Sequence, residues 1–593
     1  MMPRSNQTVA ATVAIALLLT ALAACSAEEE AGDFVPVTDS MLQDPVPENW
    51  LMWRRTLDSW GYSPLDQIDR DNVDGLQMVW KRELAPGLQQ GTPLVYDGIM
   101  YMPNPTDFIQ ALDAATGDVI WEHRRELPAD VGQYLPPEYT GHNRNLAIYG
   151  RYIIDTSVDD YVFALDAATG QLAWETRILD YKVNPAHQTS GPIIANGKVI
   201  SGRGCLPQGG PDACVVTAHD AQTGEELWRR RTIPAPGEPG DESWGDVAFE
   251  DRRHVGTWMV PSYDPELNLV FVGTSVASPA PKFMLGGIDK KHLYHNSTLA
   301  LNADTGEIVW YYQHVNDHWD FDHPFERLLV DTAVAPDASV QWVNPGIDHG
   351  AVRRVVTGIP GKTGIVYTLD RATGEFLWAT PTVRQTVVAD IDGETGEVSV
   401  NPDVVFTEVG QEVKVCPTWY GGKAWEAGAY SPVTNSMYMP LQNACATMTV
   451  NPEGQDLGAE VYALSSVPEL APGAAQLGTV RAISAETGAT LWTYEQRTQT
   501  TSLVATGGGL VFGGDAGGKF RALDQLTGEV LWEVDLGVAV TGFPITFAVD
   551  GRQYVAASTG ISGTVFSHAP LTPEIQMQFQ NMQTNNLYVF ALP

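Results

Sequence analysis

Residues 111–121 read Ala-Leu-Asp-Ala-Ala-Thr-Gly-Asp-Val-Ile-Trp, and the chain repeats this pattern with small changes as far as residues 522–532. In each copy an apolar, β-like run meets a polar turn, and a second β-like run carries a tryptophan four residues after the glycine. Glycine supplies the left-handed turn conformation, while Asp and Thr side chains can bond the backbone of the turn. Each copy therefore predicts a β-hairpin. The copies end on Trp121, Trp174, Trp228, Trp310, Trp378, Trp492 and Trp532.

The spacing of these hairpins predicts the fold class. Repeats of roughly 40–55 residues with several strands each are typical of propeller blades rather than of helical solenoids. A tryptophan at a fixed place on every returning strand can fill the wedge between neighbouring sheets. The long interval between Trp378 and Trp492 indicates insertions on one face. We therefore expect an all-β propeller with W-type repeats.

The two ends of the chain indicate how such a ring closes. Residues 588–592 repeat the sequence of residues 161–165, but no turn and no tryptophan follow them. The missing half of that hairpin resembles residues 76–81, near the N-terminus. We therefore predict eight blades, the last built from one N-terminal and one C-terminal strand. Closure of this kind leaves few exposed strand edges.

Composition limits the class of partner. The repeats span nearly all 593 residues, which favours one large domain over several ordinary ones. With 72 Asp and Glu against 35 Lys and Arg, the formal net charge is −37. Such a protein is repelled by nucleic-acid phosphates, so nucleic acid is not an expected partner. The acidic surface serves solubility or, alternatively, docking of a basic protein.

The N-terminus reads as an export signal rather than as part of the fold. Arg4 precedes an apolar run over residues 9–24, which is short for a membrane span. Residues 22–25, Leu-Ala-Ala-Cys, resemble a bacterial lipobox, so we expect a lipid on Cys25; a plain Ala-x-Ala cleavage signal is the alternative. The sequence thus predicts an export signal at 1–25, an acidic tether at 26–48, a propeller at 49–593 and a periplasmic location.

Five cysteines fit this reading. Removing Cys25 leaves four, enough for two disulfides in an oxidising compartment. Cys205 and Cys214 flank a loop rich in glycine and proline, and a disulfide between them would close that loop. No Cys-x-x-Cys-His sequence occurs, so covalent c-type haem is not expected.

Function must come from residues in the central funnel, since propellers serve many activities. The stretches 263–269, 297–301 with 319–322, and 364–371 resemble the quinoprotein alcohol dehydrogenases, as do 508–512 and 553–556. That family holds pyrroloquinoline quinone (PQQ) on the axis of an eight-bladed propeller. The resemblance covers about residues 49–593 and implies PQQ as cofactor and an alcohol as substrate. It also implies a disulfide between Cys416 and Cys445.

The resemblance assigns the catalytic residues one by one. Asp320 falls at the position of the family's catalytic base, where a carboxylate accepts the proton of the substrate hydroxyl. Lys362 falls beside the reactive quinone oxygens, where a cation stabilises negative charge. Alone, the first would read as a turn residue and the second as a surface lysine.

Five further residues match cofactor-binding positions. Trp258 matches the tryptophan that stacks on the quinone, and Arg144 an arginine that pairs with a PQQ carboxylate. Thr189 and Ser190 match hydroxyls at another carboxylate, although a polar turn explains them almost as well. Trp425 is expected to wall the pocket, with plain packing as the alternative.

The sequence departs from the family where a metal is bound. The usual asparagine is replaced by Val276, and the usual glutamate aligns with Pro207, leaving Asp212 as the one nearby carboxylate. The family's adjacent cysteines would fall near residues 138–139, and Ala424 replaces another asparagine. A divalent cation would polarise the quinone and favour oxygen ligands. We expect calcium, or alternatively a lanthanide, on Asp320 and Asp322, with hydroxyls such as Thr274 and Ser275.

The resemblance therefore predicts an exported, PQQ-dependent dehydrogenase that passes electrons to an external acceptor such as a soluble cytochrome c. The rebuilt loop between Cys205 and Cys214 and the missing adjacent cysteines imply a pocket unlike that of the methanol enzymes, which favours a bulky or secondary alcohol. The competing interpretation is a lipid-anchored, non-catalytic propeller scaffold of outer-membrane assembly, since lost metal ligands can mean lost catalysis.

Overall fold

The computed structural model describes residues 34–593 except 136–141, 453–461, 563–567 and 576–584. The predicted export signal and Cys25 lie outside the described residues. Strands make up 42% of the structure and helices 7%, which confirms the all-β class. None of the helices in the described part of the chain has the length and apolarity needed to cross a membrane.

The hairpins predicted from the repeats belong to eight sheets of four or five strands within the described residues. The first contains β3 (Leu94–Tyr96), β4 (Ile99–Asn104), β5 (Phe108–Asp113) and β6 (Val119–Arg124), paired in that order. The next three are β7 (Ala147–Tyr149), β8 (Tyr152–Thr156), β9 (Tyr161–Asp166) and β10 (Leu172–Arg177); β12 (Ile193–Ala195), β13 (Lys198–Ser201), β15 (Val215–Asp220) and β16 (Glu226–Arg231); and β17 (Ser262–Asp264), β18 (Leu269–Gly273), β19 (Ser297–Asn302) and β20 (Ile308–Gln313).

The remaining sheets carry the insertions. They are β21 (Leu328–Ala333), β23 (Val352–Gly358), β24 (Ile365–Asp370), β25 (Phe376–Pro381) and β22 (Trp342–Val343); β29 (Ala429–Ser431), β30 (Ser436–Gln442), β33 (Gly478–Ser484) and β34 (Thr490–Gln496); β1 (Tyr62–Ser63), β35 (Thr500–Thr506), β36 (Leu510–Asp515), β37 (Lys519–Asp524) and β38 (Val530–Asp535); and β2 (Gln77–Leu84), β41 (Asn585–Ala591), β40 (Arg552–Thr559) and β39 (Ile545–Val549). The interval between Trp378 and Trp492 also holds two small sheets, β26 (Val388–Ile391) with β27 (Val398–Val400), and β28 (Glu412–Val415) with β31 (Ala444–Val450) and β32 (Leu464–Leu470).

The repeated tryptophan docks each sheet on the next one. Trp121 on β6 donates from Nε1 to the carbonyl of Ala167 at 2.9 Å, and a Cβ at Gly170 would lie 2.5 Å from its indole ring. Only glycine therefore fits beneath the indole, which explains why the turn glycine and the tryptophan recur together. The same contact joins Trp80 to Gly117, Trp174 to Gly224, Trp228 to Gly306, Trp310 to Gly374, Trp378 to Gly488, and Trp492 to Gly528.

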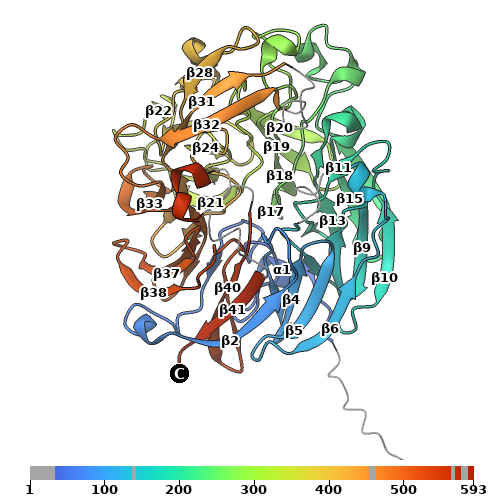
Figure 1. The fold of residues 1–593 in the computed structure, drawn as a ribbon, viewed down its shortest axis with the longest axis vertical. Helices are drawn as coiled ribbons and strands as arrows, with labels where there is room; N and C mark the ends of the chain where they lie inside the picture. The colour runs from blue at the N-terminus through green and yellow to red at the C-terminus, as the bar shows by residue number, and fades with distance from the viewer. Residues whose placement is uncertain (1–33, 136–141, 453–461, 563–567, 576–584) are drawn as a thin grey trace, which may run out of the picture. The chain divides into compact units, whose positions relative to one another are not determined.

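Strands from opposite ends of the chain share one sheet. β2 pairs antiparallel with β41, with Met78 opposite Phe590, and the side chain of Asn585 donates to the carbonyl of Ala85. In Figure 1 the blue β2 runs beside the red β41. Trp532 from the preceding sheet donates to the carbonyl of Leu76, just before β2. The predicted pairing of the two terminal strands is therefore present.

The segment before residue 49 packs on the sheets. The backbones of Val37 and Gly150 exchange two hydrogen bonds of 2.7 and 2.8 Å, and α1 (Asp39–Gln43) follows. The carboxylate of Asp39 accepts a bond from the Tyr149 hydroxyl at 2.8 Å. These contacts therefore lie before residue 49, where we predicted that the tether ends and the propeller begins.

Both expected disulfides are formed. Cys205 is bonded to Cys214, and the loop between them contains two short 3-10 turns, Pro207–Gly209 and Pro211–Ala213. Cys416 is bonded to Cys445.

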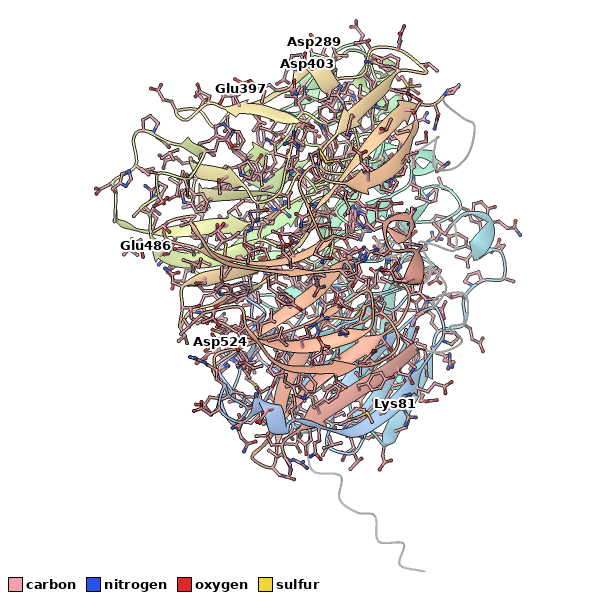
Figure 2. All side chains as sticks on the ribbon, turned by 60° about the vertical axis from the view of Figure 1, so that its left-hand side comes forward. Lys81, Asp289, Glu397, Asp403, Glu486 and Asp524 are labelled. Carbon is pink, nitrogen blue, oxygen red and sulfur yellow. A yellow bond between two sulfur atoms is a disulfide. The ribbon has the colours of Figure 1, made fainter. Side chains whose placement is uncertain are left out.

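Several acidic side chains in turns and short helices are exposed. Asp289, Glu397 and Asp403 are exposed, and all three are labelled in Figure 2. Lys291 forms an ion pair with Glu397 at 2.8 Å, but surface pairs of this kind contribute little to stability. The exposed carboxylates agree with the strongly negative net charge.

Candidate active site

Two carboxylates and one ammonium meet at the predicted catalytic residue. The Lys362 ammonium lies 2.9 Å from Oδ2 of Asp320 and 3.2 Å from Oδ2 of Asp322. It also donates to the backbone carbonyl of Asp320 at 3.1 Å. All three side chains are at least nine-tenths buried. The structure thus brings together the predicted base, its neighbouring carboxylate and the predicted cation.

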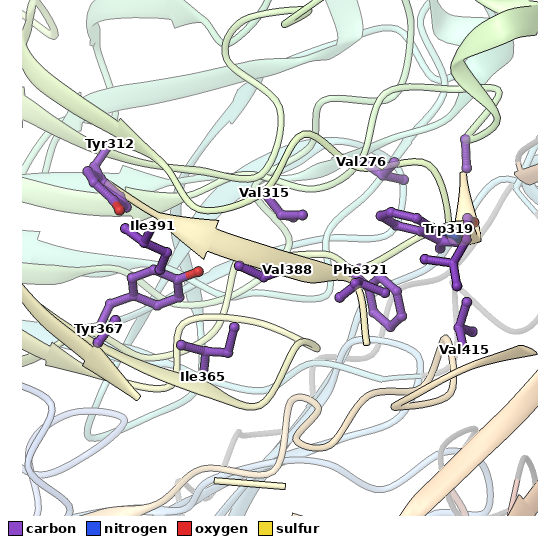
Figure 3. Packing of buried hydrophobic residues seen from close by; sticks show 14 of the residues in the cluster. Val276, Tyr312, Val315, Trp319, Phe321, Ile365, Tyr367, Val388, Ile391 and Val415 are labelled. Atoms are coloured by element: carbon purple, nitrogen blue, oxygen red, sulfur yellow. Dashed lines mark hydrogen bonds between the residues drawn. The ribbon is translucent and has the colours of Figure 1, made fainter. Parts of the chain in front are cut away.

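The loop that carries Asp320 is anchored on both sides. Its neighbours Trp319 and Phe321 are buried in a hydrophobic cluster, where Figure 3 shows them side by side. The carboxylate of Asp317 accepts bonds from the backbone nitrogens of Trp319 and Phe321 and from the amide of Asn296. Asp320 itself has φ of +73°, an uncommon conformation for a residue other than glycine. Packing on both sides therefore imposes a backbone strain of the kind that often marks functional sites.

The two carboxylates are held at different proton affinities. Burial and the charge of Asp322 raise the pKa of Asp320, and Lys362 opposes this only in part. Burial alone would raise the pKa of Asp322 too, but the charge of Lys362 and the hydrogen bonds from the Val276 nitrogen and Lys362 outweigh it and lower that pKa. Asp322 also accepts a bond from the Val276 backbone nitrogen at 2.8 Å. Asp322 therefore stays charged, while Asp320 can gain and lose a proton.

A second buried cation, Arg144, lies between two indoles. Its guanidinium carbon lies 5.2 Å from the ring centre of Trp258 and 5.5 Å from that of Trp425. Nη1 donates to the carbonyls of Thr189 at 2.9 Å and Trp258 at 3.3 Å, and Nη2 lies 3.2 Å from Nε2 of His142, whereas Nε has no partner among the described residues. The guanidinium forms no ion pair with a carboxylate in the described part of the chain. Burial, opposed in part by the charge of Glu426, lowers the pKa of Arg144 to about 9.

The two predicted hydroxyl ligands lie beside this arginine but bond to other groups. The hydroxyl of Thr189 lies 3.2 Å from Nδ1 of His187. The hydroxyl of Ser190 donates to the carbonyl of Gly202 at 2.9 Å. Their predicted role toward a cofactor carboxylate therefore stays a prediction.

Two histidines that the sequence analysis missed lie near both groups. Nδ1 of His254 lies 2.7 Å from the carbonyl of Cys205, in the disulfide-closed loop, so that nitrogen carries the proton. Burial and the charge of Arg144 lower the pKa of His187 to about 3, against an opposing effect of Asp322. Burial also lowers the pKa of His254, so both histidines bring neutral imidazoles close to the buried charges.

The hydroxyls expected to complete a metal site are already engaged. Ser275 donates to the carbonyl of His254 at 3.0 Å and accepts from the Gly256 nitrogen. Thr274 donates to the carbonyl of Tyr294. Asp212, the one carboxylate of the disulfide loop, is exposed and paired with Arg231 at 2.8 Å. No group of three His, Cys, Asp or Glu side chains in the described ranges is arranged to hold a metal ion.

Residues 138–139, expected at the other face of the quinone, lie outside the described residues. A cavity of about 650 Å³ lies elsewhere; Asp58, Trp60 and Arg371 contribute to its lining, and none of the predicted site residues does.

Comparison with known proteins places this geometry in a family. Residues 50–402 and 474–555 match the PQQ-dependent family described as glucose/ethanol/alcohol dehydrogenase, β-propeller domain. The chain is 32% identical over 554 residues to the quinohemoprotein alcohol dehydrogenase ADH-IIG of Pseudomonas putida, covering 89% of this chain and 74% of that protein. It is 29% identical to the quinoprotein alcohol dehydrogenase PedH of Pseudomonas putida, covering 93% and 92% of the two chains.

Solved structures of related dehydrogenases have the same fold as this chain. The ADH-IIG structure superimposes with a TM-score of 0.82 at 29% identity, covering 94% of this chain and 83% of that one. A europium-containing methanol dehydrogenase superimposes with a TM-score of 0.80 at 26% identity, covering 93% and 99%. The propeller fold, the matched family and the buried Asp320–Lys362 pair lead to one conclusion: this chain belongs to the PQQ-dependent alcohol dehydrogenase family.

Proposed function

We propose that the protein oxidises an alcohol to a carbonyl compound with PQQ, and that Asp320 accepts the hydroxyl proton. The observation that carries this proposal is the state of the Asp320 carboxylate. Oδ2 is bonded to Lys362, whereas Oδ1 is buried and has no hydrogen-bond partner among the described residues. Because buried acceptors are rarely left without a partner, Oδ1 is a natural acceptor for a substrate hydroxyl.

The residues around Arg144 fit a flat, anionic cofactor. A buried guanidinium with an unpartnered Nε and no carboxylate partner in the described residues is costly unless an anion binds to it. PQQ carries carboxylates and, when bound, accepts the hydride of the alcohol carbon. In our proposal Arg144 holds one carboxylate, Trp258 offers an aromatic face, and Trp425 closes the wall. Thr189 and Ser190, whose hydroxyls also contact His187 and Gly202, are the proposed ligands of another PQQ carboxylate.

The residues do not fit the expected divalent cation. Calcium takes six to eight oxygen ligands, and a lanthanide would compete for the same carboxylates. Of the ligands that we predicted, Asp320 and Asp322 are bridged by Lys362, and the hydroxyls of Thr274 and Ser275 bond the backbone. We therefore assign no step of the reaction to a metal.

We further propose that the eight sheets are eight blades of one closed ring. The support is the series of tryptophan contacts from sheet to sheet, together with the pairing of β2 with β41. The sheet that contains β2 would then be the closing blade, since Trp532 reaches it from one side and its own Trp80 reaches Gly117 on the other.

Substrate, acceptor and location are proposed from the sequence. The rebuilt loop between Cys205 and Cys214, together with the missing adjacent cysteines near residues 138–139, supports a bulky or secondary alcohol. A soluble cytochrome c is the proposed acceptor, since no haem-attachment sequence occurs. The N-terminal apolar stretch and Cys25 support export to the periplasm with a lipid anchor.

The test is a reconstitution with purified protein. PQQ is added, and dye reduction is measured over a panel of primary, secondary and bulky alcohols. We expect alcohol-dependent reduction that Asp320→Asn lowers by about 100-fold or more while PQQ still binds. Protein that binds no PQQ under any condition, and reduces no dye, would support the scaffold interpretation instead.

A further inference from the structure

We infer that the Lys362 ammonium is the resident cation of the active site, so that PQQ binding and alcohol oxidation need no divalent cation. This inference rests on the proposed function and deepens it. It concerns the space between Asp320 and Asp322, the two carboxylates expected to hold a metal.

The ammonium is saturated by the oxygens that a metal would use. It has three N–H donors and lies 2.9 Å from Oδ2 of Asp320, 3.2 Å from Oδ2 of Asp322 and 3.1 Å from the Asp320 carbonyl. The second oxygen of Asp322 accepts the bond from the Val276 nitrogen. Of the four carboxylate oxygens, only Oδ1 of Asp320 lacks a partner in the described residues.

The lysine is fixed at its backbone as well as at its ammonium. Its nitrogen donates to the carbonyl of Asp322 at 2.9 Å, and its carbonyl accepts from the nitrogen of Gly422 at 2.9 Å. Gly421 packs so closely that a Cβ there would lie 2.8 Å from the Cα of Lys362. Because the side chain is also about nine-tenths buried, moving the ammonium aside would leave a buried charge without its partners.

The net charge of the site and the number of available ligands also argue against a divalent cation beside Lys362. Two carboxylates and one ammonium leave about one negative charge among these groups, and a divalent cation beside the ammonium would reverse that sign in a buried site. The nearby hydroxyls of Thr274 and Ser275 already bond the backbone, and Nδ1 of His254 bonds Cys205. The six or more oxygens that calcium takes are therefore not available among the described side chains.

Lys362 would then supply what a metal supplies elsewhere. A fixed positive charge next to Asp320 favours negative charge that develops during the reaction, as a Lewis acid does. An ammonium held by two carboxylates differs from a metal in one measurable way: it cannot be removed by a chelator.

The first test is a metal titration that does not depend on activity. CaCl₂ and LaCl₃ are titrated separately into the full protein, with and without PQQ, by calorimetry and thermal unfolding. We expect no binding heat and no shift in Tm for the wild type. Lys362→Ala frees the two carboxylates and should gain a weak site, with a Kd on the order of 10⁻⁴–10⁻³ M. Lys362→Arg, which keeps the charge, should not gain it.

The second test compares PQQ binding and turnover in excess EDTA and in excess calcium. We expect the same PQQ affinity and the same turnover in both. Lys291→Ala, which removes a surface ion pair with Glu397, is the control for loss of a lysine and should behave as wild type.

The outcomes separate the inference from the proposed function. Calcium or lanthanum binding by the wild type that Asp322→Ala abolishes would overturn the inference, as would PQQ binding or turnover seen only with a metal. Absence of PQQ binding in every condition would overturn the proposed function instead, and the titration of the cofactor-free protein would still decide whether Lys362 holds the cation position.

Discussion

Lys362 and Arg144 are both buried cations of one site, yet their surroundings shift their pKa values in opposite directions. Burial alone would lower the pKa of Lys362, but the charges of Asp320 and Asp322 outweigh burial and raise it. Burial lowers the pKa of Arg144 to about 9, because the charge of Glu426 offsets it only in part. The charge of Lys362 is neutralised by carboxylates of the protein, whereas Arg144 has no carboxylate partner among the described residues.

The difference indicates what each half of the site can bind. A buried ion that is paired and hydrogen-bonded has little to gain from a further ligand, whereas an unpaired one favours any anion that reaches it. The Lys362 half is therefore built for proton transfer with its own charges, and the Arg144 half for holding a carboxylate from outside.

The largest effect is expected when Asp320, the proposed catalytic base in the Lys362 half of the site, is replaced. Asp320→Asn keeps the size and the hydrogen bonding but removes the proton acceptor, so turnover should fall by about 100-fold or more. PQQ affinity, measured by the change in PQQ absorbance, should be unchanged because Arg144 and Trp258 are intact. Near-normal turnover with PQQ bound would show that another group is the base.

The next largest effect is expected from breaking the Arg144 half. Arg144→Met removes charged hydrogen bonds worth about 1.5–3 kcal/mol, so the Kd for PQQ should rise by about 10-fold to 100-fold. The cofactor-free protein should also melt at a higher temperature, because an unpaired buried charge is gone. Arg144→Lys should fall between wild type and Arg144→Met. A lower Tm for the methionine variant would contradict the claim that the buried charge of Arg144 is not offset by its hydrogen bonds within the protein.

A smaller effect is expected from Trp258, which contacts Arg144 and packs edge-on against Phe325. Trp258→Leu removes a stacking contribution of about 0.5–1.5 kcal/mol, which corresponds to a weakening of PQQ binding of about 10-fold at most. Trp60→Leu is the matched control, since Trp60 lies away from the site and donates to the Leu329 carbonyl. Equal PQQ affinity in the two variants would remove Trp258 from the site.

The smallest effect is expected in the pH profile. A base works when deprotonated, so kcat/KM should rise with pH through the pKa of Asp320, which lies above the usual carboxyl range. The charge of Asp322 helps to raise that pKa. Asp322→Asn should therefore move the rising limb toward lower pH, as measured by initial rates at saturating PQQ. A shift toward higher pH would contradict this coupling.

The sheets could be predicted from the sequence because their signals are local. Each turn glycine, the polar residues around it and the tryptophan that follows lie within eleven residues, and the same eleven residues determine how one sheet docks on the next. The packing of Val37 on Gly150 could not be predicted in this way. The segment around Val37 is acidic and poor in glycine, and it contains no copy of the repeat from which its contact could be predicted.

The site was predictable where the resemblance supplied a motif. Lys362 and Asp320 are 42 residues apart and still meet as expected. His254 and His187 were missed because each is a single histidine without metal-ligand spacing, and what places His254 is a backbone with φ of +64° and a bond to the disulfide loop. The nearest signal in the sequence was the position of His254 four residues before Trp258.

The shared sheet of β2 and β41 also has a consequence for folding kinetics. Asn585 and Ala85 touch across 500 residues, and joining the ends of so long a loop costs about 5 kcal/mol of chain entropy, before any constant term. The hairpins of that sheet and of its neighbours can form sooner, so the pairing of β2 with β41 is expected late in folding. A circular permutant that joins the natural ends and opens the chain at an exposed turn would bring β41 and β2 much closer along the chain, with residues 592–593 and 1–76 between them. Its refolding should be faster, with the native contacts unchanged.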